Sequence, residues 1–259
     1  MFASSEYYSL MIIDLNADVG ECAATDADLL SVITSANIAC GAHAGDDALI
    51  RRTVRLAIAH GVGIGAHPSF PDREGFGRRV LAMSPVDVTR TVEAQINVLV
   101  AAARDAGARL QHIKPHGALY HLAASDPTYA AAIGETVRRV DPGLIVVALA
   151  GSAMVQVLRT MGLRVAREAF IDRGYTASGT LIPRDQMGAL VTDVDDAAAR
   201  AVRLVQERVV RSIRGIDVRV EADTLCVHGD TPNAVGLAQA ARRALEGAGV
   251  TVQSMAAFL

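Results

Sequence analysis

The stretch Val62-Gly63-Ile64-Gly65-Ala66-His67-Pro68 decides the fold class, because it is a short apolar run that stops at a histidine beside a proline. Three other runs also end at a histidine close to a glycine or proline, in residues 37–43, 113–117 and 225–230. Parallel α/β proteins deliver polar side chains to one edge of the sheet, at the carboxyl ends of buried strands. The four histidines therefore predict one shared pocket.

Seven runs rich in Ile, Val and Leu recur along the chain, at residues 11–16, 36–40, 62–66, 110–114, 144–150, 163–167 and 224–228. They read as continuous rather than alternating apolar runs, which is typical of strands buried on both faces. Helical stretches lie between them, opened by capping residues such as Asp46 and Ser84 and closed by glycines such as Gly107 and Gly162. This alternation predicts one parallel sheet.

A closed barrel and an open doubly wound sheet both satisfy that alternation. An open sheet gathers its ligand contacts near one switch point, whereas here at least four of the seven predicted strands end in a candidate site group. We therefore predict a seven-stranded parallel β/α barrel that forms a single domain over residues 11–259. Residues 1–10 are interpreted as an N-terminal extension.

Composition excludes several classes of function. The 259 residues are 51% hydrophobic with a net charge of -3, which suits one large core and provides no basic field for nucleic acid. No stretch reaches the ~18 apolar residues of a membrane span. The three cysteines, Cys22, Cys40 and Cys226, lack the spacing of a zinc knuckle or a disulfide framework, so we expect a cytoplasmic protein. From the charge and the apolar runs, we expect neither a nucleic-acid nor a membrane partner.

The first run carries the acidic pattern Asp14-Leu15-Asn16-Ala17-Asp18. Strand periodicity places Asp14, Asn16 and Asp18 on one face, and carboxylates that converge suit general acid–base work or a cation site. A solvated loop cap is the ordinary alternative. Asp14 argues against it, because it interrupts the apolar run.

Glycines surround His43, at positions 41 and 45, just before a helix expected to begin near Asp46. This pattern suits a turn that cradles an anionic ligand, and an ordinary strand-to-helix turn is the alternative. The long loop that follows His67 carries Arg73, Arg78 and Arg79, which could clamp a carboxylate or phosphate or form a solvated charge cluster.

Further candidates follow the later strands. His112, Lys114 and His116 share a strand face, where a desolvated lysine could stabilise developing negative charge. Asp172 and Arg173 follow the sixth run as site groups or as a loop ion pair. His228 and Asp230 after the last run resemble a base and the acid that orients it.

Familiar catalytic signatures are absent from the sequence, including a phosphate-binding P-loop, a Gly-x-Ser-x-Gly elbow and a His-Glu-x-x-His helix. Conventional P-loop ATPases, serine hydrolases and zincins are therefore disfavoured. The glycines of residues 61–65 look nucleotide-like, but they lie within a predicted strand rather than between a strand and a helix.

Taken in order, these motifs resemble the LamB/YcsF family, and the resemblance rests on residues 14–18, 34–41, 43–46, 64–68, 75–79, 114–120, 172–175 and 226–232. It implies a seven-stranded barrel of the glycoside hydrolase/deacetylase type. It also implies the A subunit of a bacterial ATP-dependent 5-oxoprolinase, which cleaves 5-oxoproline to glutamate together with B and C subunits.

With the resemblance in place, site roles can be hypothesised. His67, His116 and His228 handle protons, Lys114 and Arg78 or Arg79 hold the substrate carboxylate or a phosphorylated oxygen, and Asp14 or Asp18 activates water. Substrate binding is also assigned to Asn16, Glu21, His43, Asp172, Arg173 and Asp230. ATP is bound here or shared with a partner subunit.

A divalent cation such as Mg²⁺ is left open, and no residue is assigned as a metal ligand. Two alternatives to the oxoprolinase remain: a metal-dependent deacetylase-like amidohydrolase on the same barrel, and a non-catalytic subunit of an oxoprolinase complex.

Overall fold

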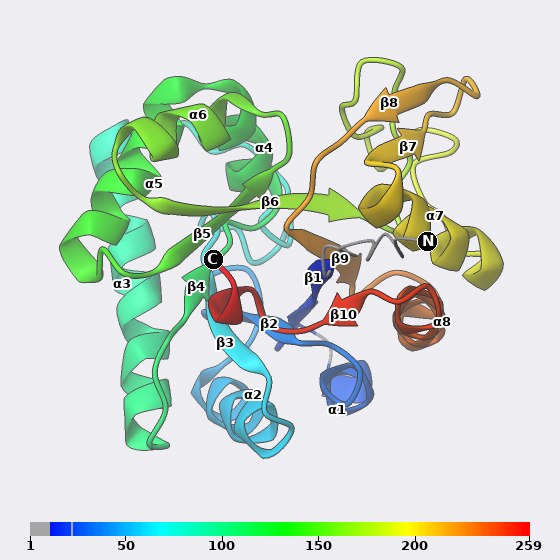
Figure 1. Cartoon of the computed structure of the whole chain (residues 1–259). Helices are drawn as coiled ribbons and strands as arrows, with labels where there is room; N and C mark the ends of the chain where they lie inside the picture. The colour runs from blue at the N-terminus through cyan, green and yellow to red at the C-terminus, as the bar shows by residue number, and fades with distance from the viewer. Residues whose placement is uncertain (1–10, 22) are drawn as a thin grey trace, which may run out of the picture.

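A closed parallel barrel organises the computed structural model, which describes residues 11–21 and 23–259 (Figure 1). The expected extension over residues 1–10 lies outside the described residues. The last barrel strand pairs with both the sixth and the first, which closes the sheet and confirms the predicted seven-stranded barrel. The barrel strands are β1 Ile12–Val19, β2 Ser35–Ala39, β3 Gly63–His67, β4 His112–Ile113, β5 Ile145–Leu149, β6 Arg164–Phe170 and β9 Thr224–His228.

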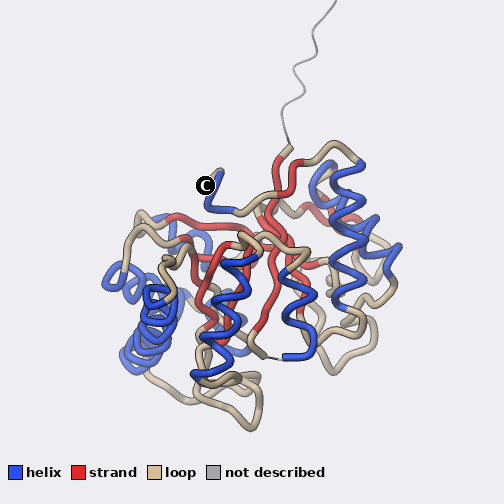
Figure 2. The backbone as a smooth tube through the Cα atoms, turned by 90° about the horizontal axis from the view of Figure 1, so that it is seen from below, coloured by secondary structure: helices blue, strands red, loops and turns tan. Residues whose placement is uncertain are grey.

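Helices surround the strands on the outside, as Figure 2 shows from a second direction. They are α1 Ala23–Leu30, α2 Asp47–Ala59, α3 Pro85–Asp105, α4 Gly117–Ser125, α5 Pro127–Val140, α6 Ala153–Thr160, α7 Val194–Gln206 and α8 Ala234–Gly247. The predicted caps form, since the side chains of Asp46 and Ser84 accept hydrogen bonds from backbone amides in the first turns of α2 and α3. Among the described residues, none of the helices has both the length and the apolar character to cross a membrane.

Additions to the barrel were not predicted. The strands β7 Val209–Arg211 and β8 Asp217–Arg219 form an antiparallel hairpin beside α7, outside the barrel (Figure 1). Another short strand, β10 Thr251–Val252, pairs with the start of β1. The chain then ends in the 3-10 helix η1 Met255–Ala257.

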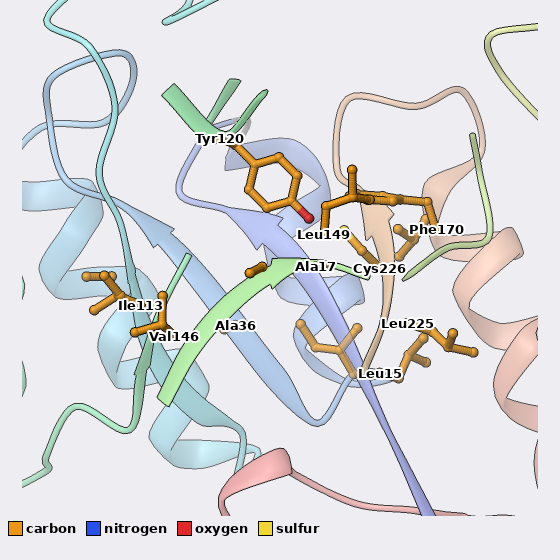
Figure 3. Close-up of a cluster of buried hydrophobic side chains, with 14 of the residues drawn as sticks. Leu15, Ala17, Ala36, Ile113, Tyr120, Val146, Leu149, Phe170, Leu225 and Cys226 are labelled. Carbon is orange, nitrogen blue, oxygen red and sulfur yellow. The ribbon is translucent and has the colours of Figure 1, made fainter. Parts of the chain in front are cut away.

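The main hydrophobic core lies between the barrel and the helices. Successive side chains of a strand point to opposite faces, so Leu15 and Ala17 of β1 pack outward with Leu225 of β9 (Figure 3). All three side chains are fully buried. Burial of this layer against the helices is the main source of stability for the fold.

The barrel interior is polar, contrary to the expectation of apolar runs on both faces. Asn16 donates from Nδ2 to Glu168 Oε1 at 3.1 Å and to Thr224 Oγ1 at 2.6 Å, and Asn37 Nδ2 donates to Asn16 Oδ1 at 2.7 Å. These four residues are fully buried. Each of these hydrogen bonds joins two different strands, so the interior is held by a connected polar network.

An apolar plug closes the other end of the barrel. Met255 of η1 packs with Ile145, Val147 and Ala166 in a cluster separate from the main core. The Met255 amide donates to Asp14 Oδ1 at 3.2 Å, so Asp14 lies at this closed end. The polar carboxyl ends of the strands are left as the open end.

Candidate active site

A cavity of 340 Å³ opens at the carboxyl ends of the strands. Its wall includes seven of the residues predicted for the site, namely Asp18, His67, Arg78, Lys114, His116, Arg173 and His228. His43 lies directly behind this wall, with its ring stacked on that of His116 at a centroid distance of 3.9 Å. The four strand-end histidines thus gather at one end of the barrel, as predicted.

Lys114 is locked into a buried ion-pair network. Its Nζ lies 2.9 Å from Asp18 Oδ1 and 2.8 Å from Glu168 Oε1. Burial alone would lower the pKa of Lys114, but the charge of Asp18 and of further acidic groups including Glu168 raises it well above its ordinary value. Lys114 is therefore a permanent cation at the floor of the cavity.

Asp18 is the matching anion. Burial would raise the pKa of its carboxyl, but the interaction with His67 and the charge of Lys114 outweigh burial and hold it well below its usual range. Its Oδ2 lies 3.3 Å from His67 Nε2, and its Oδ1 also accepts a hydrogen bond of 2.9 Å from Asn37. Asp18 is thus ionised and held from three sides.

Glu21, His43, His67 and His116 form a compact group beside Asp18, which we call the Glu21–histidine cluster. Glu21 Oε1 lies 2.7 Å from His43 Nε2 and 3.2 Å from His116 Nδ1, and His116 Nδ1 lies 2.9 Å from His67 Nε2. Burial lowers the pKa of His43 to about 3 and that of His116 well below its ordinary value. Burial and the charge of Asp18 raise the pKa of Glu21 well above its usual range.

His228 is oriented by Asp172, so the predicted pairing with Asp230 is wrong. Its Nδ1 lies 2.9 Å from Asp172 Oδ2, which also accepts from the His228 amide at 2.9 Å and from Thr231 Oγ1 at 2.7 Å. Burial would raise the pKa of Asp172, but its interaction with His228 and the hydrogen bond from Thr231 outweigh burial and lower the pKa to about 2. Because the ionised carboxylate accepts the Nδ1 proton, Nε2 of His228 is the ring nitrogen free for the cavity.

Asp230 instead bridges two arginines at the cavity mouth. It forms an ion pair with Arg78, and its Oδ2 lies 3.5 Å from Arg184 Nη1. Both guanidinium groups line the cavity. An anionic ligand that reaches them must compete with the Asp230 carboxylate.

Two residues of the site, Arg184 and Glu168, were not predicted from the sequence. Arg184 comes from the long segment between β6 and α7, and no sequence signal separated it from other loop arginines. Glu168 lies in β6 and accepts from the Tyr120 hydroxyl at 2.7 Å. An acid inside an apolar strand is rarely buried without a partner, and that was the signal available for Glu168.

Some predicted site residues do not reach the cavity. Asp14 lies at the closed end, so its expected convergence with Asp18 is wrong. Arg79 turns outward and pairs with Asp72, and 59% of its side chain is exposed. The Asp72 carboxylate is fixed in place because it also accepts a hydrogen bond from the Gly75 amide of the same loop. Asn16 lies deeper in the polar interior.

Arg173 reaches the cavity wall but is occupied by the loop that follows β6. Its guanidinium donates to the carbonyl oxygens of Ala189 at 3.1 Å and Ile182 at 2.6 Å. It therefore positions the segment that carries Arg184.

Comparison with known proteins is consistent across sequence and structure. The A subunit of the 5-oxoprolinase of Heliobacterium modesticaldum is 48% identical, over 94% of this chain and 98% of that protein. The corresponding A subunit from Geobacillus kaustophilus is 47% identical over 93% and 96%. A crystal structure of a lactam utilization protein from Thermus thermophilus superposes with a TM-score of 0.89 at 48% identity, covering 94% of this chain and 99% of that one.

More distant structures share the fold alone. A family 4 carbohydrate esterase from Streptomyces lividans matches with a TM-score of 0.53 at 11% identity, over 93% of this chain and 91% of that one. The model of the LamB/YcsF family matches residues 13–259, which include every residue of the cavity wall. With that match and relatives of nearly equal length, this chain belongs to the LamB/YcsF family.

Proposed function

We propose that this chain is the A subunit of an ATP-dependent 5-oxoprolinase, which opens the lactam ring of 5-oxo-L-proline to L-glutamate with hydrolysis of ATP, together with B and C subunits. The names of its relatives, which are A subunits of 5-oxoprolinases and a lactam utilization protein, support this assignment. The observation that carries it is the pairing, in one small cavity, of the oriented His228 with the cationic mouth of Arg78 and Arg184.

The substrate calls for both features. A five-membered lactam is a stable amide, and its opening puts negative charge on the carbonyl oxygen or first requires phosphorylation of that oxygen. The substrate also carries a carboxylate. Arg78 and Arg184 can bind either anion by replacing Asp230 as the partner of their guanidinium groups.

His228 is the proposed proton-transfer group. Asp172 holds the ring by Nδ1, so Nε2 can accept a proton from attacking water and return it to the lactam nitrogen as the ring opens. Lys114 has a different role from the one hypothesised from sequence. It keeps Asp18 ionised and in place, because its ammonium group is already bound by Asp18 and Glu168.

The test is turnover in the reconstituted complex, measured as glutamate and ADP formed from 5-oxoproline and ATP. We expect His228→Asn to lower kcat by about 10²- to 10⁴-fold, the usual contribution of a positioned acid–base group. The matched control is His60→Asn at the exposed end of α2, which should leave kcat unchanged. Normal turnover by the His228 variant would remove His228 from the mechanism.

Two further outcomes would overturn the assignment itself. Glutamate formation without ATP would contradict the coupling, and full activity of the partner subunits without this chain would make it a non-catalytic subunit. The remaining alternative is a metal-dependent deacetylase-like amidohydrolase, which the Glu21–histidine cluster favours. It predicts hydrolysis of N-acetylated substrates by this chain alone, without ATP.

A further inference from the structure

We infer that the Glu21–histidine cluster is a binding site for one divalent transition-metal ion, at the edge of the proposed substrate cavity. The inference goes beyond the proposed lactam hydrolysis, because the ligand set belongs to this chain whatever reaction the complex performs. It rests on the positions of four donor atoms and on the hydrogen bonds that fix the three imidazole rings.

The donor atoms surround a common point. Glu21 Oε1, His43 Nε2, His67 Nε2 and His116 Nδ1 all lie within 4.8 Å of one another. The separations given above run from 2.7 to 3.2 Å, and His67 Nε2 lies 3.7 Å from Glu21 Oε1. Metal–ligand bonds of about 2.0–2.2 Å place neighbouring donors about 2.8–3.6 Å apart in octahedral or tetrahedral geometry. The donor separations therefore match a coordination shell, but the rings of His43 and His116 are stacked in parallel at 3.9 Å, so one of the two must turn for both lone pairs to point at one ion.

Two of the rings have their protons directed away from that point. His67 Nδ1 lies 2.7 Å from the Lys114 carbonyl oxygen, and His116 Nε2 lies 2.8 Å from the Phe76 carbonyl oxygen. A carbonyl oxygen can only accept, so each of these ring nitrogens carries the proton. When both rings are neutral, as metal binding requires, His67 Nε2 and His116 Nδ1 are bare, and they face each other at 2.9 Å.

His43 is held in the same way through a hydroxyl group. Its Nδ1 lies 2.9 Å from Ser69 Oγ, and that hydroxyl donates its own proton to the Phe70 carbonyl oxygen at 2.8 Å. Ser69 therefore accepts from His43 Nδ1, which leaves His43 Nε2 bare against Glu21 Oε1. Outer hydrogen bonds that fix the tautomer are the usual support of metal-binding histidines.

A shared cation resolves the arrangement. With the rings neutral and Glu21 ionised, three bare imidazole nitrogens and a carboxylate oxygen would repel one another at these distances, and a metal ion bound between them would replace that repulsion by coordination. Asp18 adds a second carboxylate, with Oδ2 3.3 Å from His67 Nε2. His67 and His116 also line the cavity, so the ion would keep a side open to water or substrate.

The donor set selects the class of metal. Imidazole suits Zn²⁺, Fe²⁺, Co²⁺ and Ni²⁺, whereas Mg²⁺ prefers carboxylate, carbonyl and water oxygens. Three histidines with one glutamate therefore favour a first-row transition ion over the Mg²⁺ considered from the sequence. One alternative remains, in which protons take the place of a metal: the Glu21 carboxyl, whose pKa is raised, donates to His43 Nε2, and a further proton is shared by His67 and His116.

Metal binding to the purified full chain tests the inference. After treatment with a chelator, the chain is titrated with Zn²⁺ and separately with Co²⁺, and bound metal is measured by elemental analysis after dialysis. We expect one ion per chain, and a visible absorption spectrum of bound Co²⁺ that reports imidazole ligation. Failure to retain either ion would overturn the site and favour the bridging proton.

Variants show which residues bind. His43→Asn and Glu21→Gln should each weaken Zn²⁺ binding by at least about 100-fold, since each removes a direct ligand. The matched control is His121→Asn, which alters a histidine of the same cavity that is not part of the cluster and should bind one ion as before. Circular dichroism and thermal unfolding check that each variant is folded.

Loss of binding in the control as well as in the cluster variants would contradict the assigned ligands, as would undiminished binding by the cluster variants. The assay contains no 5-oxoproline, ATP or partner subunit. Its outcome is therefore independent of the turnover test, and either proposal can fail alone.

Discussion

Asp14 is an ionisable group buried at the closed end of the barrel. Compared with the natural chain, the Asp14→Asn variant should therefore gain stability as the pH rises from acidic to neutral. The Asp14 carboxyl is fully buried and accepts hydrogen bonds from Ser35 at 2.6 Å, Thr34 at 2.8 Å and the Met255 amide at 3.2 Å, and from Thr224. Burial outweighs these bonds and raises the pKa of Asp14 from 3.8 to about 6.

The size of the effect follows from that shift. A carboxyl whose folded-state pKa is raised contributes its full stability below pH 3.8 and loses it as the pH rises through about 6. The shift of about two units corresponds to about 3 kcal/mol at about 1.4 kcal/mol per unit. Asparagine resembles the protonated acid and does not titrate, so the Asp14→Asn variant escapes this loss.

Urea unfolding of both proteins between pH 4 and pH 7.5 measures the difference. The free energy of unfolding of the variant, relative to the natural chain, should rise by about 2.4 kcal/mol across this range, because part of the effect is already present at pH 4. Asp185→Asn, at an exposed position, controls for the loss of one negative charge. A difference that stays constant with pH would refute the reasoning, and a loss of turnover in folded Asp14→Asn would restore the catalytic role hypothesised from sequence.

Two other substitutions test the barrel interior by urea unfolding. Gly65→Ala places a Cβ 2.0 Å from His112 Nε2 and should cost about 1–3 kcal/mol or prevent folding, whereas Gly247→Ala meets open space and should change stability by less than about 1 kcal/mol; equal effects would contradict this packing. Lys114→Met leaves the Asp18 carboxylate without its buried cation and should cost about 3–5 kcal/mol, and a neutral effect would show that the network does not depend on this charge.

The glycines of β3 illustrate what the sequence could and could not predict. The run was correctly predicted as a strand, in which its nucleotide-like glycines lie. The structural role of these glycines depends on side chains that come from the segment leading into β4. Gly63 and Gly65 leave room for Gln111 and His112, and this contact cannot be predicted from the sequence of β3 alone. The hairpin of β7 and β8 was missed since its strands are three residues each and mostly exposed.

The predictions for Asp14 and Asp230 were wrong for the same reason, because the sequence does not show which residues are neighbours in space. Strand periodicity correctly placed Asp14 and Asp18 on one face, but a shared face extends along the whole strand, from the plugged end to the open one. Asp230 was chosen to orient His228 because it is near in sequence. Asp172 does so because β6 and β9 are neighbours in the closed barrel, which the order of strands along the chain does not reveal.

The polar interior connects the barrel to the chemistry at its mouth. Glu168 accepts from Tyr120 and Asn16 and pairs with Lys114, which in turn holds Asp18 at the edge of the cavity. A buried network of connected hydrogen bonds and ion pairs has few alternative arrangements, since displacing one of these groups leaves a charge or donor unpaired in a medium of low dielectric constant. Asp18 therefore meets the substrate cavity already oriented. Apolar replacements of buried ion pairs are often no less stable, but an apolar interior could not hold an ionised carboxylate in place. Charge fixed before the reaction lowers the barrier for opening an amide.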